Sequence, residues 1–159
     1  MKRLMIAVLI TALGLLSING VQAEDDKATM QQIAQRYFEV MVASQAPGAT
    51  EKELENYLAL LTDDVGHQHI PYETDDSRHP DGKQSMRKGM TFYLGAHTEY
   101  SAELLNLFTF NDTAIAIRYT HSAKGIHPQS NQPVSYTSIM MEVLEIEDGK
   151  VAMIRKYHE

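Results

Sequence analysis

His67 and His69 are separated by one residue within the stretch 65–70, whose composition predicts a short strand. Successive strand side chains point to opposite faces, so histidines two positions apart share one face. A neutral imidazole both donates and accepts hydrogen bonds and takes up a proton near neutral pH. The spacing therefore predicts one wall of a ligand cavity, with His69 as a candidate general base.

Two alternatives remain open for this pair. Histidines at this spacing bind zinc or copper when a third ligand is close, and His121 or His158, on later predicted strands, would be possible third ligands. The chain has no cysteine and no helical His-x-x-x-His pair, so we expect neither a metal nor another cofactor. The simpler alternative is a pair of hydrogen-bonded pocket histidines without a catalytic role.

Glu142 lies in a predicted strand over residues 134–147, on the face that it shares with Leu144. A carboxyl group on a buried face is costly unless it is neutral or paired. Glu142 is therefore either a functional group of perturbed pKa or the partner of a basic residue in the last strand, where Arg155 and Lys156 are available.

Tyr37 lies at helical spacing within residues 28–45 and either anchors that helix through its ring or polarises a ligand carbonyl. Other polar and aromatic residues are candidates for ligand contact because they occupy the same predicted strands or the loop after the first one. They are Tyr72, Tyr119, His121 and His158, together with His67.

The elements that would position these residues follow from periodicity and turn signals. Apolar residues predict helices over 28–45, from a capping box at Thr50 to Leu61, and over 83–94. Strands are predicted over 65–70, 98–110, 113–123, 134–147 and 150–158, with an acidic turn at 63–64 and a hairpin turn at 148–149. Helices that come first, followed by antiparallel strands, indicate an α+β fold with helices on one face of a sheet.

The N-terminus predicts a secretory signal peptide over residues 1–23. Lys2 and Arg3 precede an apolar run that ends at Leu16, and a small-residue site follows, so we expect cleavage after Ala23. An uncleaved anchor is the alternative, but the apolar run is short for a membrane span. We expect a single mature domain over residues 24–159, in the periplasm or secreted.

The charge of the mature chain restricts its partners. Removing Lys2 and Arg3 lowers the basic count from 14 to 12 against 21 acidic residues, a net charge of −9. Such an acidic surface without a basic cluster disfavours nucleic acid and anionic lipid. The remaining partners are small molecules and protein, so we expect a small-molecule ligand and no membrane association after cleavage.

The sequence resembles the nuclear transport factor 2-like (NTF2-like) superfamily, which includes SnoaL-type polyketide cyclases and ketosteroid isomerases. The resemblance rests on Asp63-Asp64 before the first strand and on Asp148-Gly149-Lys150-Val151 before the last. It implies a cone-shaped, cystatin-like fold, in which a curved antiparallel sheet packs on the N-terminal helices around a pocket. It also implies a homodimer through the outer sheet face, which agrees with the apolar residues Ile139, Met141 and Val143 on the second face of their strand.

The resemblance to ketosteroid isomerases extends to three positions. Arg36-Tyr37-Phe38-Glu39 matches the segment whose tyrosine donates to the substrate oxyanion, His69 stands in place of the general base, and Glu142 replaces a protonated aspartate. Two functions follow. The first is a periplasmic domain that binds a small, largely apolar ligand in its pocket. The alternative is an acid–base isomerase, cyclase or hydratase, with His69 as base and Tyr37 and Glu142 as oxyanion stabilisers.

Overall fold

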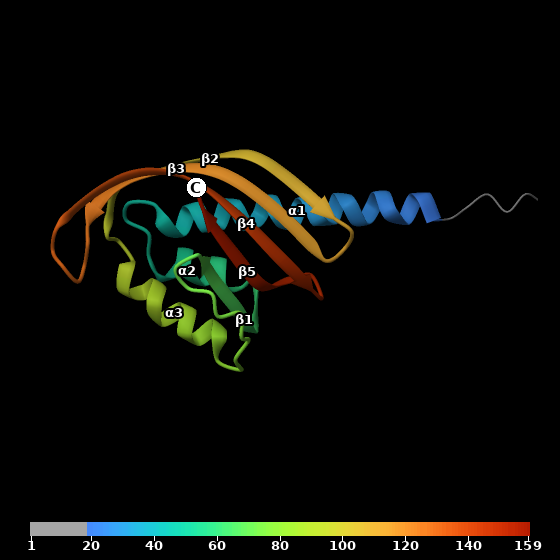
Figure 1. Cartoon of the computed structure of the whole chain (residues 1–159), viewed down its shortest axis with the longest axis horizontal. Coiled ribbons are helices and arrows are strands. Elements are labelled where there is room, and N and C mark those ends of the chain that lie inside the picture. The colour runs from blue at the N-terminus through green and yellow to red at the C-terminus, as the bar shows by residue number, and fades with distance from the viewer. Residues whose placement is uncertain (1–18) are drawn as a thin grey trace, which may run out of the picture.

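The computed structural model describes residues 19–159, with side chains from Thr29 onward. Its elements are α1 (Asn19–Gln45), α2 (Glu51–Leu58), β1 (Leu61–Ile70), α3 (Gly82–Tyr93), β2 (His97–Phe110), β3 (Ala114–Ile126), β4 (Pro133–Glu147) and β5 (Lys150–His158) (Figure 1). The predicted order of helices and strands is confirmed. Most of the predicted signal peptide lies outside the described residues. No helix in the described part is long and apolar enough to cross a membrane.

The five strands form one curved sheet in the order β1-β5-β4-β3-β2. β2 to β5 pair antiparallel with their sequence neighbours, as consecutive hairpin-connected strands do. The prediction of an antiparallel sheet is wrong for β1, which pairs with β5 in parallel. The physical reason is that α3 and its loops separate β1 from β2, so no hairpin joins them and β1 takes the free edge beside the last strand.

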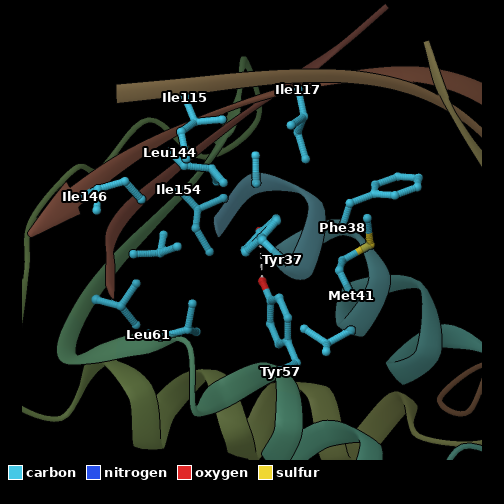
Figure 2. Close-up of a cluster of buried hydrophobic side chains, with 14 of the residues drawn as sticks. Tyr37, Phe38, Met41, Tyr57, Leu61, Ile115, Ile117, Leu144, Ile146 and Ile154 are labelled. Carbon is cyan, nitrogen blue, oxygen red and sulfur yellow. Dashed lines mark hydrogen bonds between the residues drawn. The ribbon is translucent and has the colours of Figure 1, made fainter. Parts of the chain in front are cut away.

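The sheet arches over the helices, and α1 runs beneath the arch with α2 and α3 on its other side (Figure 1). Tyr37 and Met41 of α1 meet Ile117, Leu144 and other apolar side chains of the sheet in one buried cluster (Figure 2). Alternate residues of β3, β4 and β5 therefore face the helices, and any polar residue at the same parity enters this interior.

The second helix begins at the predicted capping box but ends at Leu58, three residues before the predicted end, because Leu61 already belongs to β1. Thr50 accepts from the Lys52 backbone N–H while the Glu53 side chain accepts from Thr50, which satisfies donors that the helix start would otherwise leave free. Its stripe of Leu54, Tyr57 and Leu58 is buried. Helix α3 forms over nearly the predicted range, Gly82–Tyr93, and none of its residues is fully buried: Met86 and Met90 pack partly buried against the core, and Tyr93 is 49% exposed.

The predicted acidic turn is instead part of β1. Asp63 and Asp64 lie within the strand, where its register with β5 is irregular between Leu61 and Gly66. Lys83 donates to Asp63 at 2.7 Å and Arg78 donates to Asp64 at 2.8 Å. These cations compensate two adjacent carboxylates, so the strand continues through a sequence that is otherwise typical of a turn.

Candidate functional site

Glu142 of β4 is a carboxylate inside the core, with none of its surface exposed. The Lys156 ammonium lies 2.9 Å from Oε1, the Tyr119 hydroxyl donates to the same oxygen at 2.6 Å, and the Tyr37 hydroxyl donates to Oε2 at 2.7 Å. The Tyr57 hydroxyl lies 3.0 Å from that of Tyr37, and the dashed line in Figure 2 marks this hydrogen bond. The predicted pairing of Glu142 with a basic residue of the last strand is confirmed for Lys156.

The electrostatics of this network make Glu142 an ionised acceptor. Burial alone would raise the pKa of Glu142, but the Lys156 ammonium and the two tyrosine hydroxyls outweigh burial, so this pKa lies below its ordinary value. Burial and the Glu142 charge raise the pKa of Tyr37 and of Tyr119. At neutral pH both phenols therefore stay protonated and donate to a carboxylate.

This arrangement bears on the roles predicted for Tyr37 and Glu142. Tyr37 is fully buried, and its hydroxyl proton already goes to Glu142. Glu142 is deprotonated, so it has no proton to donate to a developing oxyanion. The structure brings the two residues into contact, and the Tyr37 hydroxyl donates to Glu142 Oε2 rather than to a ligand. Their catalytic roles stay predictions, and of the three residues only His69 keeps partial exposure.

Three of the predicted histidines converge near Lys156. His69 is the register partner of Lys156 across the β1–β5 pair, so their side chains share the helix-facing side of the sheet. His69 Nδ1 lies 3.3 Å from His158 Nε2, and the ring centroids of His67 and His69 are 4.4 Å apart. We call His67, His69 and His158 the imidazole cluster.

The imidazole cluster is neutral at physiological pH. Burial, the Lys156 ammonium and His69 lower the pKa of His67 to about 3. Burial, Lys156 and His158 lower the pKa of His69 to about 4. The pKa of His158 is lowered by burial and by Lys156. Neutral rings each present one donor and one acceptor, and among the described residues no side chain or backbone group hydrogen-bonds to the ring nitrogens of His67.

Sequence reasoning identified Lys156 only as a possible partner of Glu142 and not as a candidate site residue. Its side chain is 20% exposed, its ammonium contacts the buried carboxylate, and the residue lies opposite His69 across the β1–β5 pair. The available signal was parity, since Lys156 precedes His158 by two residues on one strand and must share its face.

The other predicted ligand contacts divide into two groups. Tyr72 is 80% exposed, and its ring lies 5.3 Å from that of His158, at the edge of the imidazole cluster. Tyr119 is buried, and its ring lies 5.7 Å from that of His121. His121 also contacts two tyrosines that the sequence did not single out. They are Tyr100 and Tyr136, at 6.1 and 5.5 Å between centroids, and with Tyr119 and His121 they form what we call the aromatic strip.

The metal alternative finds no support in the geometry. Within residues 29–159 no group of three or more histidine or acidic side chains is arranged to hold a metal ion. His67, His69 and His158 lie together, but their contacts are ring-to-ring and a histidine–histidine hydrogen bond.

Two of the hollows on the described surface have no histidine in their lining. One of about 270 Å³ lies over β2, β3 and β4 and includes Tyr100 and Tyr136. The other, of about 450 Å³, surrounds the ion pairs of Arg78 with Asp64 and Glu147. The imidazole cluster is therefore not in either hollow, although His69 is partly exposed and His158 exposed.

Acid is expected to destabilise the fold through His67. An unfolded histidine has a pKa of about 6.5, against about 3 for His67 in the fold. Between these values the unfolded chain binds more protons, so stability falls as the pH falls, by at most about 1.4 kcal/mol per pH unit for one histidine. The free energy of unfolding of His67→Asn, measured by urea denaturation between pH 6 and 4, should fall less steeply with pH than that of the original chain. His79→Asn, in an exposed loop, is the control, and equal slopes in all three chains would contradict the assignment.

Comparison of the sequence with protein-family models and with curated protein sequences gives no match. Solved structures do match. A phenazine biosynthesis-related protein from Pseudomonas aeruginosa superposes with a TM-score of 0.64 at 14% identity, over 89% of this chain and 86% of that one. An NTF2-like protein from Anabaena variabilis gives 0.60 at 19% identity, over 92% and 96%. The fold is NTF2-like.

Another structure with the NTF2-like fold is an LEH-like epoxide hydrolase from M. tuberculosis, with a TM-score of 0.58 at 17% identity, over 80% of this chain and 84% of that one. The predicted cone-shaped α+β fold is thus confirmed. At these identities the likeness concerns the NTF2-like fold and not a shared reaction, so the function has to be argued from the residues of this chain.

Proposed function

We propose that this protein binds a small, largely apolar molecule that carries a polar head group, on the helix-facing side of its sheet. The observation that supports this most is the gathering of the imidazole cluster around the Lys156 ammonium. Neutral imidazoles and an ammonium at one partly exposed place offer both donors and acceptors. Sites of this kind fix the orientation of a ligand with a few polar groups.

The aromatic strip is suited to the apolar part of such a ligand. Tyr119 lies between Glu142, which holds its hydroxyl, and His121, which contacts its ring. Beyond His121 the rings of Tyr100 and Tyr136 continue the same surface. Aromatic faces contribute a large contact area at little conformational cost, which favours binding of an apolar body next to the polar cluster.

An acid–base reaction remains the second candidate because His69 is neutral and partly exposed, as a general base must be. Two features of the site count against it. A pKa of about 4 makes His69 a weak base at neutral pH. The hydroxyl of Tyr37 and the carboxylate of Glu142 are bonded to each other rather than directed at a ligand. Binding therefore uses more of the observed arrangement than proton transfer does.

The proposed setting is the periplasm, or outside the cell, which depends on the export signal expected over residues 1–23 and on cleavage after Ala23. The acidic mature chain agrees with a small molecule rather than nucleic acid as partner.

The binding function is testable with 2-naphthylmethanol, a probe with an apolar two-ring body and one hydroxyl group. We expect the imidazole Cε1–H NMR signals of His69 and His158 to shift on titration, in a saturable manner. His79 and His127, which lie in loops away from the cluster, supply internal controls. Equal shifts of all histidine signals, or no saturable shift at His69 and His158, would rule out the proposed site.

We also propose that two copies associate through the outer face of the sheet. Phe108 and Phe110 of β2 are 62% and 76% exposed, and register places Phe108 beside Ala116 and Ala116 beside Val143. An apolar row across three strands on an exposed face is typical of an interface. Because every copy carries the same row, a second copy would bury it symmetrically.

The variant Phe108→Glu should convert the dimer to a monomer in sedimentation velocity at micromolar concentration, because each copy would place a carboxylate in the apolar contact. Phe92→Glu on α3, a substitution of the same kind at a residue 53% exposed, should remain dimeric. A monomeric original chain, or an equal effect of the two substitutions, would contradict this interface.

A further inference from the structure

The Lys156 ammonium has hydrogen-bonding capacity that the chain does not use. An ammonium carries three N–H donors. Among the described residues one partner is present, Oε1 of Glu142 at 2.9 Å. The side chain is 20% exposed, and Lys156 lies opposite His69 in the β1–β5 pair and on the strand face that it shares with His158.

Both oxygens of the Glu142 carboxylate, the partner of Lys156, already accept hydrogen bonds. Glu142 Oε1 receives Lys156 and Tyr119, and Oε2 receives Tyr37. Glu142 and the two tyrosines are buried, whereas the Lys156 side chain is 20% exposed. A ligand at the imidazole cluster therefore meets the exposed part of the ammonium before it meets the negative charge behind it, and charged hydrogen bonds are about twice as strong as neutral ones.

We propose, building on the binding function above, that the head group of the ligand is a carboxylate that accepts hydrogen bonds from Lys156 and from the one imidazole N–H that the His69–His158 hydrogen bond leaves free. A carboxylate has two oxygens with about four lone-pair directions, which matches an ammonium flanked by two rings. His69 and His158 are 3.3 Å apart between ring nitrogens, so they present their remaining groups from one point of the sheet.

The rest of the ligand follows from the neighbouring row of residues. His158 pairs in register with Met140, and Met140 pairs with Tyr119. Two strand spacings separate His158 from Tyr119, roughly 10 Å. Tyr119 itself is buried, but His121, the next member of the aromatic strip, is partly exposed, so the ligand class is an apolar, ring-containing monocarboxylate.

The experiment compares 2-naphthoate with 2-naphthylmethanol by calorimetry on the mature full chain. The two probes share the same rings and differ in the head group. We expect 2-naphthoate to bind at least tenfold more tightly. A ratio of affinities near one would overturn the carboxylate assignment while leaving the binding function in place, provided that 2-naphthylmethanol still shifts the His69 and His158 signals. Binding of neither probe would overturn both proposals.

Variants test the role of Lys156 in this preference. The double substitution E142Q/K156M removes both charges together, which avoids leaving a lone carboxylate in the core. We expect the ratio of affinities to fall to about one in this variant and to stay unchanged in Lys150→Met, at the exposed start of the same strand. An unchanged ratio in E142Q/K156M would overturn the role of Lys156, and the comparison of the two probes on the original chain does not depend on how well the variant folds.

Discussion

Lys156→Met is expected to lower the free energy of unfolding by about 3 kcal/mol or more, measured by urea denaturation at pH 7. The substitution removes the cation that lies 2.9 Å from Glu142 and leaves a fully buried carboxylate with two neutral tyrosine donors. Removing one partner of a buried pair is costly because the remaining charge cannot regain its hydration.

The double substitution E142Q/K156M provides the matched control for this effect. With both charges gone, a neutral amide can still accept from Tyr37 and Tyr119, so we expect most of the lost stability to return. Lys150→Met, on an exposed residue of the same strand, should change stability by less than about 0.5 kcal/mol. If Lys156→Met proved as mild as Lys150→Met, Glu142 would not carry a charge in the folded chain.

Tyr37→Phe is expected to destabilise the fold by about 2 kcal/mol, because Oε2 of Glu142 loses its one donor among the described residues and hydrogen bonds to charged groups are worth about 1.5–3 kcal/mol. Tyr57→Phe is the matched comparison. The Tyr57 hydroxyl bonds to Tyr37 and not to the carboxylate, so its loss should cost about 1 kcal/mol.

The same Tyr37→Phe variant separates a structural role from a catalytic one. Tyr37 is fully buried, so its hydroxyl lies away from the proposed ligand. We expect the NMR response of His69 and His158 to 2-naphthylmethanol to stay as in the original chain. Loss of that response in a variant that remains folded would restore the oxyanion-donor role that the sequence suggested.

The fold was predictable where the signal is local. Apolar periodicity gave the helices, the Thr50–Glu53 capping box gave the start of α2, and Asp148-Gly149 gave the last hairpin. Strand parity placed Glu142 on the buried face, and the choice of partner between Arg155 and Lys156 was open because both follow in the last strand. The register of β4 with β5 decides it, since Glu142 lies opposite Lys156 while Arg155 pairs with Glu145 on the other face.

The composition of the site depended on contacts between distant parts of the chain. His69 and His158 are 89 residues apart, and they are in contact because β1 pairs with β5 in parallel. No turn motif in the sequence predicts this pairing. The acidic pair Asp63-Asp64 is typical of a turn in the sequence. Only the structure shows that Arg78 and Lys83 lie beside the two carboxylates. The hydrogen-bond partner of Tyr37 could not be predicted either, because helical spacing indicates that a tyrosine is buried but not which group its hydroxyl contacts.

The most direct test of the account is the position of the bound probe. Intermolecular NOEs should be measured between the naphthyl protons of 2-naphthylmethanol and assigned side chains of the full mature protein. We predict contacts to the Cε1–H protons of His69 and His158 and to the partly exposed ring of His121. Contacts to Phe108 and Phe110 on the outer face instead, with none to the histidines, would contradict it.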